Sequence, residues 1–221
     1  MNNKISVLLV DDHAVVRTGY KTYLSLSNNI GDIYEADCGE TACQLYKQSS
    51  TDIVILDMSM PGIGGFETIR RLIAYDPDCR ILVFSIHDEL VYVARAIKAG
   101  AKGYIIKNSE PDILTLAVST IIQGDSFVAP ELAQKLAMSH IQGEDESHQL
   151  KQLSPREFDV FCLLANGNKA HQAAKQLCLS YKTVCNYSTT IKDKLGVRSL
   201  AEMALIANRQ GVINTMNKEQ L

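Results

Sequence analysis

Three carboxylates, one hydroxyl and one ammonium each lie at the end of a short apolar run of this chain. Asp11 and Asp12 follow VLLV, Asp57 follows DIVIL, Ser85 ends RILVFS, and Lys107 follows GYII. A carboxylate can act as the nucleophile that forms an aspartyl phosphate. Mg²⁺ prefers one or two carboxylates, waters and a phosphate oxygen as its ligands. If the fold brings these residues together, their chemistry suits the transfer of a phosphoryl group.

Short Val/Ile/Leu runs that alternate with helical patterns are typical of parallel strands covered by helices on both faces. We expect five strands, near residues 5–10, 31–36, 53–57, 80–85 and 103–107. Parallel strands point the same way, so their carboxyl ends meet at the edge where open α/β sheets bind ligands. The sequence therefore predicts an α/β domain over residues 1–124, a (βα)5 unit with flavodoxin-like strand order and one site at its edge.

The five groups have complementary charges. Asp11, Asp12 and Asp57 would repel one another at one edge, which raises their pKa values and costs folding free energy. A divalent cation removes that cost. Lys107 adds positive charge for phosphoryl oxygens, and the Ser85 hydroxyl can donate a hydrogen bond to them. We interpret Asp57 as the sole phosphoacceptor, because it alone closes the central run DIVILD. Neighbouring histidines lack the spacing of a metal-ligand set and are expected to be satisfied or solvent-facing; these are His13 and His87.

The chain after residue 124 shows no further strand pattern. Residues 129–140 favour a short helix with Pro130 in its first turn, and the polar stretch 141–152 is typical of a linker. We therefore expect residues 125–152 to form a helix and linker between two domains.

Four short helical patterns follow, which predicts an all-α domain over residues 153–214 and a tail at 215–221. Ser154 is suited to cap the first helix, Ser180 the third, and Gly196 to end the third. A fourth helix, about 199–209, would supply apolar side chains to the core, namely Leu200, Ala204 and Ala207. A helix, a tight turn and a helix bearing Lys and Thr have the layout of a helix-turn-helix domain.

The two halves differ in charge. Of the 22 basic and 25 acidic residues, ten basic and five acidic ones lie from Leu150 onward, which gives +5 there and −8 in residues 1–149. A basic half suits a polyanion, and an acidic half suits a metal. No apolar run approaches the roughly 18 residues that span a bilayer, and the six cysteines form no C-x-x-C pair. We expect a cytoplasmic protein with reduced thiols and no membrane partner.

Two groups of motifs carry a family resemblance. The first is VDDH at 10–13, LDMSMPGIGG at 56–65, Ser85 and AGAKGYIIK at 99–107, and the second is LSPRE at 153–157 and KTVCNYSTTIKDKLGV at 182–197. The first group resembles the receiver domain, and the second the helix-turn-helix domain, of the two-component response regulators of the LuxR/NarL/FixJ family. The resemblance implies that a sensor histidine kinase phosphorylates Asp57. It also implies that Asp11, Asp12, Asp57 and the main-chain carbonyl of Ser59 hold Mg²⁺. Lys107 would bind the phosphate, with Ser85 and Tyr104 as the switch hydroxyl and switch aromatic.

The family resemblance further implies a transcription regulator that dimerises on phosphorylation and binds double-stranded DNA. Its own chemistry would be limited to self-phosphorylation and self-dephosphorylation, so it is not expected to be an enzyme. The likeness is greatest to GacA/UvrY-type global regulators, in EADCGE at 35–40, MPGIGG at 60–65 and LCLSYKTV at 177–184. Regulators of that type act on genes for small RNAs that titrate a carbon-storage-type translational repressor.

The expected recognition helix, from Tyr181 to Leu195, carries few cations. Bases would be contacted by Val184, Asn186 and Ser188, and the DNA backbone by Lys182, Thr183 and Lys192. The family usually has lysine at the position of Cys185, and GacA/UvrY-like members often have arginine at the positions of Ser188 and Thr190. Their absence predicts weak binding by a monomer.

Two other function classes fit parts of the sequence. A phosphorylation-dependent protein-binding module with weakened DNA affinity fits the cation-poor recognition helix. A small phosphatase or Mg²⁺ enzyme fits the acidic strand ends, because aspartyl-phosphate chemistry occurs on doubly wound folds. The sequence offers no further acid/base pair for the second class, and turnover above one phosphate per chain would identify it.

Overall fold

The computed structural model describes residues 4–141 and 148–213. Part of the expected linker and the whole expected tail at 215–221 lie outside these residues. The chain divides into two compact units, one of residues 1–88 and 93–133 and the other of residues 89–92 and 134–221. The first contains the sheet, the second contains the last five helices, and each is described by itself below.

The first unit is built on a parallel sheet whose strand order is β2-β1-β3-β4-β5-β6. Its strands are β1 (Ile5–Val10), β2 (Ile30–Ala36), β3 (Ile53–Leu56), β4 (Ile81–Ser85), β5 (Gly103–Ile106) and β6 (Phe127–Val128). The predicted flavodoxin-like order of five strands is confirmed. β6 was not predicted, and it pairs with β5 at one edge of the sheet.

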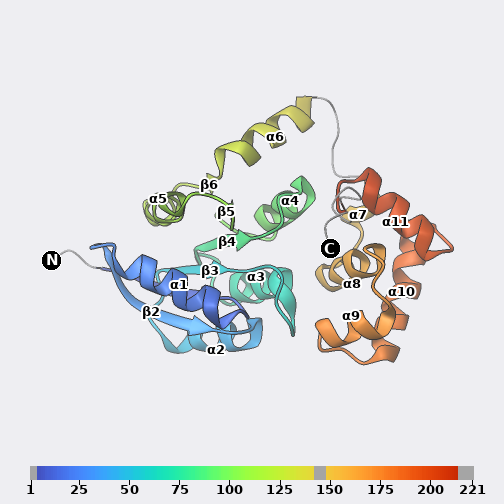
Figure 1. Cartoon of the computed structure of the whole chain (residues 1–221), viewed down its shortest axis with the longest axis horizontal. Coiled ribbons are helices and arrows are strands. Elements are labelled where there is room, and N and C mark those ends of the chain that lie inside the picture. Colours follow the sequence, from blue (N-terminus) through green and yellow to red (C-terminus); the bar gives the residue numbers. More distant parts are fainter. Residues whose placement is uncertain (1–3, 142–147, 214–221) are drawn as a thin grey trace. The chain divides into compact units, whose positions relative to one another are not determined.

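Helices follow the strands along the chain (Figure 1). They are α1 (Ala14–Ser25), α2 (Gly39–Gln48), α3 (Gly64–Tyr75), α4 (Leu90–Lys98), α5 (Pro111–Ile122) and α6 (Pro130–Ile141). The Tyr23 hydroxyl on α1 donates to Asp112 Oδ1 on α5 at 2.9 Å, so these two helices share one face of the sheet. The chain reverses its direction across the sheet after β2, and right-handed crossovers then place α2 and α3 on the other face.

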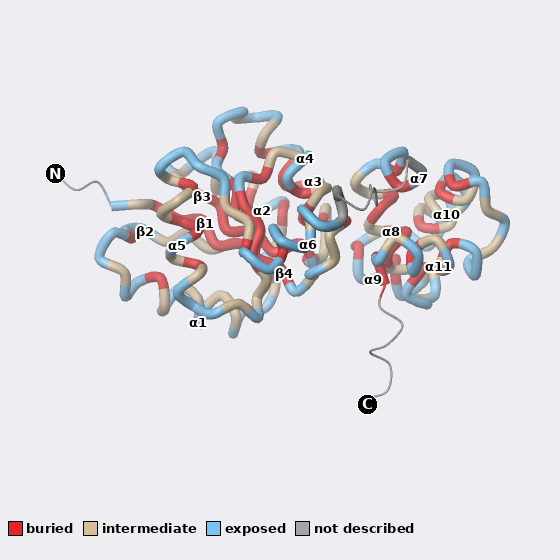
Figure 2. Tube along the Cα trace, turned by 90° about the horizontal axis from the view of Figure 1, so that it is seen from above, coloured by how far each residue is buried: buried red, intermediate tan, exposed pale blue. Residues whose placement is uncertain are grey.

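The central strands are covered on both faces, as their apolar runs predict. Leu8 on β1, Ile55 on β3 and Leu82 on β4 are all buried. Figure 2 shows this continuous buried band along β1, β3 and β4. Close packing on both faces holds these strands in the observed register, in which Val10 pairs with Leu56. A fixed register in turn fixes which residues come directly after the strand ends.

The second unit contains five helices among the described residues after 147. They are α7 (His148–Lys151), α8 (Pro155–Ala165), α9 (Ala170–Gln176), α10 (Tyr181–Leu195) and α11 (Leu200–Arg209). Three of them, α8, α10 and α11, begin at a serine N-cap. The Ser180 hydroxyl accepts a hydrogen bond from the Thr183 N–H at the start of α10, and Gly196 ends α10 with a φ of 68°. The four predicted helices are confirmed, whereas α7 was assigned to the linker.

Aromatic and small apolar side chains form the core of this unit. The rings of Phe158 and Phe161 on α8 lie 6.2 Å apart between centroids and are fully buried. α11 contributes Met203 and Ala207. The prediction that Leu200 joins this core is wrong, because that side chain is 47% exposed at the first turn of α11.

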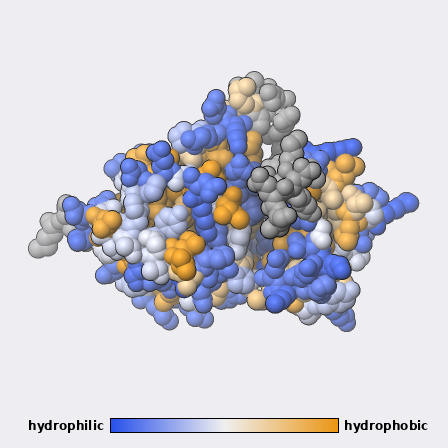
Figure 3. Space-filling model, in the orientation of Figure 1, coloured by the Kyte–Doolittle hydropathy of each residue, from blue (hydrophilic) through white to orange (hydrophobic). Residues whose placement is uncertain are grey.

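No described helix has the length and apolar character needed to cross a bilayer. The face of the molecule drawn in Figure 3 is largely hydrophilic, and its apolar atoms occur in separate small groups.

Candidate functional site

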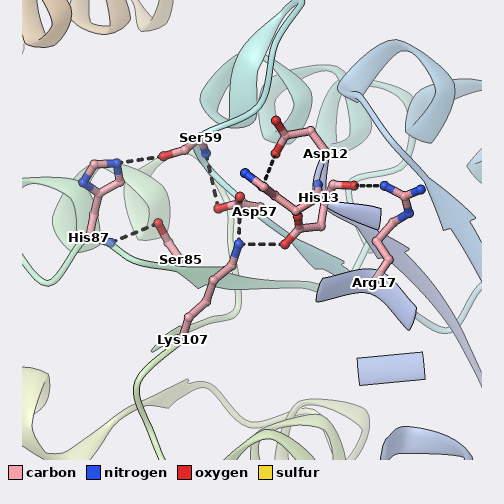
Figure 4. A network of polar contacts seen from close by, with 9 residues as sticks. Asp12, His13, Arg17, Asp57, Ser59, Ser85, His87 and Lys107 are labelled. Carbon is pink, nitrogen blue, oxygen red and sulfur yellow. Dashed lines mark hydrogen bonds and ion pairs between the residues drawn. The ribbon is translucent and has the colours of Figure 1, made fainter. Parts of the chain in front are cut away.

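The strand register brings the chemically active residues together at one edge of the sheet. Val10 pairs with Leu56 on the neighbouring strand, so Asp11 and Asp57, which follow them, leave the sheet side by side. The Asp57 N–H donates to the Val10 carbonyl at 2.9 Å. On the other side, the Lys107 N–H donates to the Ser85 carbonyl at 2.8 Å. The ends of β1, β3, β4 and β5 therefore contribute to one site, and Figure 4 shows the side chains of Asp57, Ser85 and Lys107 close together there.

Lys107 joins two of the carboxylates. Its Nζ lies 2.6 Å from Asp11 Oδ2 and 2.9 Å from Asp57 Oδ2. All three side chains are largely buried. Burial lowers the pKa of Lys107, but the charges of Asp57 and Asp11 outweigh it, and that pKa is raised overall. The lysine is therefore a stable cation that offsets the repulsion between two buried carboxylates.

The acidic cluster has the donor set of a site for a hard divalent cation. Asp11, Asp12, His13 and Asp57 each offer one ligand atom, and these atoms lie within 4.8 Å of one another. Oδ1 of Asp12 is buried and has no hydrogen-bond partner among the described residues. It lies 2.9 Å from Nδ1 of His13, but without hydrogen-bond geometry. A buried carboxylate oxygen without a donor, beside two further carboxylates, fits Mg²⁺.

The loop after Asp57 passes close to the start of α3. The Ser59 N–H donates to Asp57 Oδ1 at 3.3 Å, so the loop contacts the carboxylate directly. Gly65 on α3 allows the loop to lie this close, because a Cβ at that position would come within 2.6 Å of the Met58 Cα. The role of the Ser59 main-chain carbonyl as a metal ligand stays a prediction.

His87 connects the other residues that were predicted to form a switch. The Ser85 hydroxyl is fully buried, and its oxygen accepts the His87 N–H at 3.2 Å. The hydroxyl of Tyr104, also fully buried, donates to the His87 carbonyl at 2.8 Å. Nε2 of His87 lies 2.9 Å from Ser59 Oγ. One residue of the β4–α4 loop thus contacts Ser85, Tyr104 and the loop after Asp57.

Sequence reasoning missed three contacts of this site. His13 was expected to be satisfied or solvent-facing; its ring is 68% exposed, yet Nδ1 lies within the acidic cluster. Its position directly after two aspartates, at the N-terminus of α1, is a signal that could have been used. His87 was also expected to be satisfied or solvent-facing. The reach of Arg17 from α1 to the main-chain oxygen of Asp11, at 2.6 Å, has no signal in the sequence because it depends on tertiary packing.

The second unit presents a helix-turn-helix formed by α9 and α10. Cys178, in the turn between them, has a φ of 51°. On α10, Lys182 and Asn186 are exposed, while Ser188 and Lys192 are half-buried. The Thr183 hydroxyl lies 2.7 Å from Ser180 Oγ at the N-cap. Whether these residues contact DNA stays a prediction.

One predicted DNA contact is wrong. Val184 is fully buried on the face of α10 that also carries Ile191 and Leu195, so it packs into the core of the unit and cannot reach base edges from there. The ammonium of Lys194, although its side chain is 35% exposed, is paired within the unit, since its Nζ lies 2.6 Å from Glu157 Oε2 on α8.

Comparison with known proteins agrees with the α/β unit and with the helical unit. Residues 7–119 match the response regulator receiver domain, and residues 151–207 match the bacterial regulatory proteins of the luxR family. Response regulator GacA of Pseudomonas aeruginosa is 35% identical over 210 residues, which cover 95% of this chain and 98% of GacA. Response regulator UvrY of Escherichia coli is also 35% identical, over 95% of this chain and 96% of UvrY.

A solved structure shows the same fold over most of the chain. RcsB of Salmonella enterica serovar Typhimurium, bound to promoter DNA in the presence of the phosphomimetic BeF3⁻, superposes with a TM-score of 0.66. The match covers 93% of this chain and 99% of RcsB at 22% identity, so the likeness concerns the fold alone.

Proposed function

We propose a phosphorylation-controlled mechanism for this chain, which belongs to the bacterial response regulators that join a receiver domain to a LuxR-family DNA-binding domain. The proposal is that Asp57 accepts a phosphoryl group from a sensor histidine kinase and that this changes self-association and DNA binding. The observation that carries it is the Lys107 ammonium between Asp11 and Asp57, at an edge where a third carboxylate, Asp12, lacks a donor.

In the transfer, an oxygen of Asp57 forms a bond to phosphorus while the bond from phosphorus to the imidazole nitrogen of the kinase histidine breaks. The nitrogen keeps the electron pair. Catalysis of such a step is mostly positioning and charge stabilisation. The Asp57 carboxylate is positioned for the transfer by the Ser59 N–H at 3.3 Å and by Lys107 Nζ at 2.9 Å.

Asp11, Asp12 and Asp57 would hold Mg²⁺, with the main-chain carbonyl of Ser59 as a further ligand. The bound ion would neutralise negative charge on the phosphoryl oxygens. Lys107 is close enough to Asp57 to pair with one of those oxygens after transfer. Mg²⁺ and the Lys107 ammonium would then both face the phosphoryl group. They would be held by different elements, since Lys107 comes from the end of β5 and the aspartates follow β1 and β3.

The contacts of His87 support a switch that would act through Ser85 and Tyr104. A phosphoryl dianion attracts hydrogen-bond donors. The Ser85 hydroxyl would turn to it and release the His87 N–H, which it accepts at 3.2 Å. The Tyr104 hydroxyl holds the carbonyl of the same residue, so the β4–α4 loop and Tyr104 would respond together. We expect this change to favour a homodimer, and sedimentation of phosphorylated and unphosphorylated protein at matched concentration measures it.

DNA binding by the α9–α10 pair is supported by the domain match and by the exposed Lys182 and Asn186 on α10. RcsB, with the same fold, was solved on promoter DNA. The dimer would place two copies of α10 on two half-sites, which raises affinity because the second contact becomes intramolecular. By the resemblance of the chain's sequence motifs to GacA/UvrY-type regulators, its targets would be genes for small RNAs that titrate a translational repressor.

A second candidate is a phosphorylation-dependent protein-binding module. It is favoured by the commitment of Lys194 to Glu157, which leaves α10 with few outward cations. Chromatin pull-down with sequencing, for wild type and Asp57→Asn, distinguishes the two. Promoter enrichment that depends on Asp57 supports DNA binding. If wild type enriches promoters no more than background, the protein-binding module is the better supported function.

The phosphoacceptor itself is tested by labelling with acetyl phosphate and Mg²⁺. Wild type should take up acid-labile label, EDTA should block it, and Asp57→Asn should abolish it. Asp32→Asn, an exposed aspartate on β2, is the matched control and should label like wild type. Undiminished label in Asp57→Asn would overturn the assignment.

A further inference from the structure

We propose that Arg17 is a positioning residue that holds the peptide between Asp11 and Asp12, so that both carboxylates face the cation site. The inference rests on the proposed function, because it concerns Mg²⁺ at that site. Nη1 of Arg17 donates to the main-chain oxygen of Asp11 at 2.6 Å (Figure 4). The side chain is only 18% exposed, so the contact is made largely away from water.

The orientation of this peptide matters most for Asp12. The carboxylate of Asp11 is held directly, by the His13 N–H at 2.8 Å and by Lys107 at 2.6 Å. Asp57 is held by Ser59 and Lys107. Oδ1 of Asp12, in contrast, makes no hydrogen bond among the described residues, and its charged neighbour, Nδ1 of His13 at 2.9 Å, belongs to a ring that is 68% exposed and so holds the carboxylate only weakly. Its position therefore depends on the main chain before it, and the Asp11 carbonyl that Arg17 binds belongs to the peptide that leads into Asp12.

Arg17 is itself well anchored. It lies on the first turns of α1, where its N–H donates to the His13 carbonyl at 3.0 Å. Its Nε lies 3.8 Å from Glu35 Oε2 on β2. The other oxygen of Glu35 contacts Lys21, one turn further along α1. The guanidinium thus lies beside Glu35 without a hydrogen bond from Nε among the described residues, and its hydrogen bond to the Asp11 carbonyl connects α1 to the β1–α1 loop.

Charge and geometry predict opposite effects of removing Arg17. If the guanidinium acted through its charge alone, its loss would make the site more negative and would strengthen Mg²⁺ binding. If it acts by orienting the peptide, its loss weakens Mg²⁺ binding. Groups that orient metal ligands are worth roughly 10- to 100-fold in metal affinity. The sign of the change therefore separates the two roles.

The experiment is calorimetric titration of Mg²⁺ into the full chain, without any phosphodonor. We expect Arg17→Ala to bind Mg²⁺ at least about tenfold more weakly than wild type. Lys21→Ala is the matched control, because it removes a cation from the same helix and the same Glu35 contact but not from the Asp11 carbonyl. It should bind within about twofold of wild type, or slightly more tightly, as expected for a surface pair.

Equal or tighter binding by Arg17→Ala would overturn the inference. Thermal unfolding without Mg²⁺ shows whether that variant folds. If it does not, Arg17→Lys decides: it keeps the charge but has a shorter, non-planar donor, so weaker Mg²⁺ binding supports the positioning role and wild-type binding overturns it. Failure of the wild type to bind Mg²⁺ would instead refute the metal site of the proposed function.

Discussion

The ammonium of Lys194 on α10 lies 2.6 Å from Oε2 and 2.8 Å from Oε1 of Glu157, in the first turn of α8. The same carboxylate accepts the N–H of Ser154 at 2.7 Å and so completes the cap of α8. One cation of α10 therefore joins this helix to α8. It is not available to a phosphate backbone while this pair is intact.

This pair should make the helical unit sensitive to acid. Burial raises the pKa of Glu157, but the hydrogen bonds from Lys194 and Ser154 outweigh it, and the pKa lies below its usual 4.5. The stability that the pair contributes is present above pH 4.5 and is lost as pH falls through the lower, folded pKa. Lys194→Met should cost about 1–2 kcal/mol at neutral pH, after discounting for solvent at the lysine. Urea unfolding at pH 7 and pH 3 checks this, and an equal cost at both pH values would contradict it.

Lys107→Ala should lower the free energy of unfolding without Mg²⁺ by about 2 kcal/mol, because Asp11 and Asp57 then repel each other without a cation between them. Mg²⁺ should restore most of that loss, since it binds only the folded site. The measurement is the rise in Tm on adding Mg²⁺, which should be larger in Lys107→Ala than in wild type. Lys102→Ala removes an exposed cation just before β5 and should behave like wild type. A smaller rise in Lys107→Ala would count against this account.

Hydrogen exchange can follow the proposed switch. The His87 N–H is protected by Ser85 Oγ at 3.2 Å. Loading the site with BeF3⁻ should expose that amide and speed its exchange, because the hydroxyl turns to the phosphoryl mimic. In Ser85→Ala the amide should exchange fast in both states. Ser59→Ala removes the hydroxyl beside the His87 ring but not the acceptor of the His87 amide. In that variant the difference in exchange rate between the BeF3⁻-loaded and unloaded protein should therefore persist. Unchanged exchange in loaded wild type would refute the switch.

Cys185→Lys should tighten DNA binding and steepen its salt dependence. Cys185 is half-buried on α10, one turn after Tyr181. Each added phosphate contact changes the slope of log affinity against log salt by about −0.9, so we expect a change of up to about one unit. Ala201→Lys, on an exposed position of α11, adds the same charge elsewhere and should leave the slope nearly unchanged. Equal slopes for both variants would show that α10 does not face the DNA backbone at Cys185.

Cys178→Gly should stabilise the turn between α9 and α10. Its φ of 51° lies in the left-handed region, which costs a residue with a Cβ about 1–2 kcal/mol relative to glycine. Glycine also gains more entropy in the unfolded chain, so the net gain should be about 0.5–1 kcal/mol. Cys178→Ala removes the thiol but keeps the Cβ, and should not be stabilised. Urea unfolding compares the two, and a glycine variant weaker than the alanine variant would show that the turn is not strained.

Much of the receiver site could be predicted because parallel strands turn sequence position into spatial position. An apolar run followed by Asp11, and another followed by Asp57, place both residues at one sheet edge without further information. Contacts that depend on tertiary reach could not be predicted. The guanidinium of Arg17 and the ring of His87 reach their partners from a helix and a loop, and no local pattern encodes those distances.

In the helical unit, the helix caps could be predicted, but the role of one side chain was predicted wrongly. Its caps were predictable, since Ser154 and Ser180 are local signals. The assignment of Val184 to base contacts failed because it lies on the apolar face of α10, and an amphipathic helix places that face in the core. β6 was missed because it has only two residues, too few to show a period.

The placement of the phosphoacceptor site at the carboxyl ends of the strands leaves the opposite rim of the sheet without site residues. At that rim, Asn28 and Asn29 lie exposed between α1 and β2. Lengthening a surface loop costs little free energy, because loop-closure entropy grows slowly with length. Insertions during evolution, or a reporter peptide spliced in by design, can therefore accumulate at Asn28–Asn29 while the acceptor chemistry is inherited unchanged.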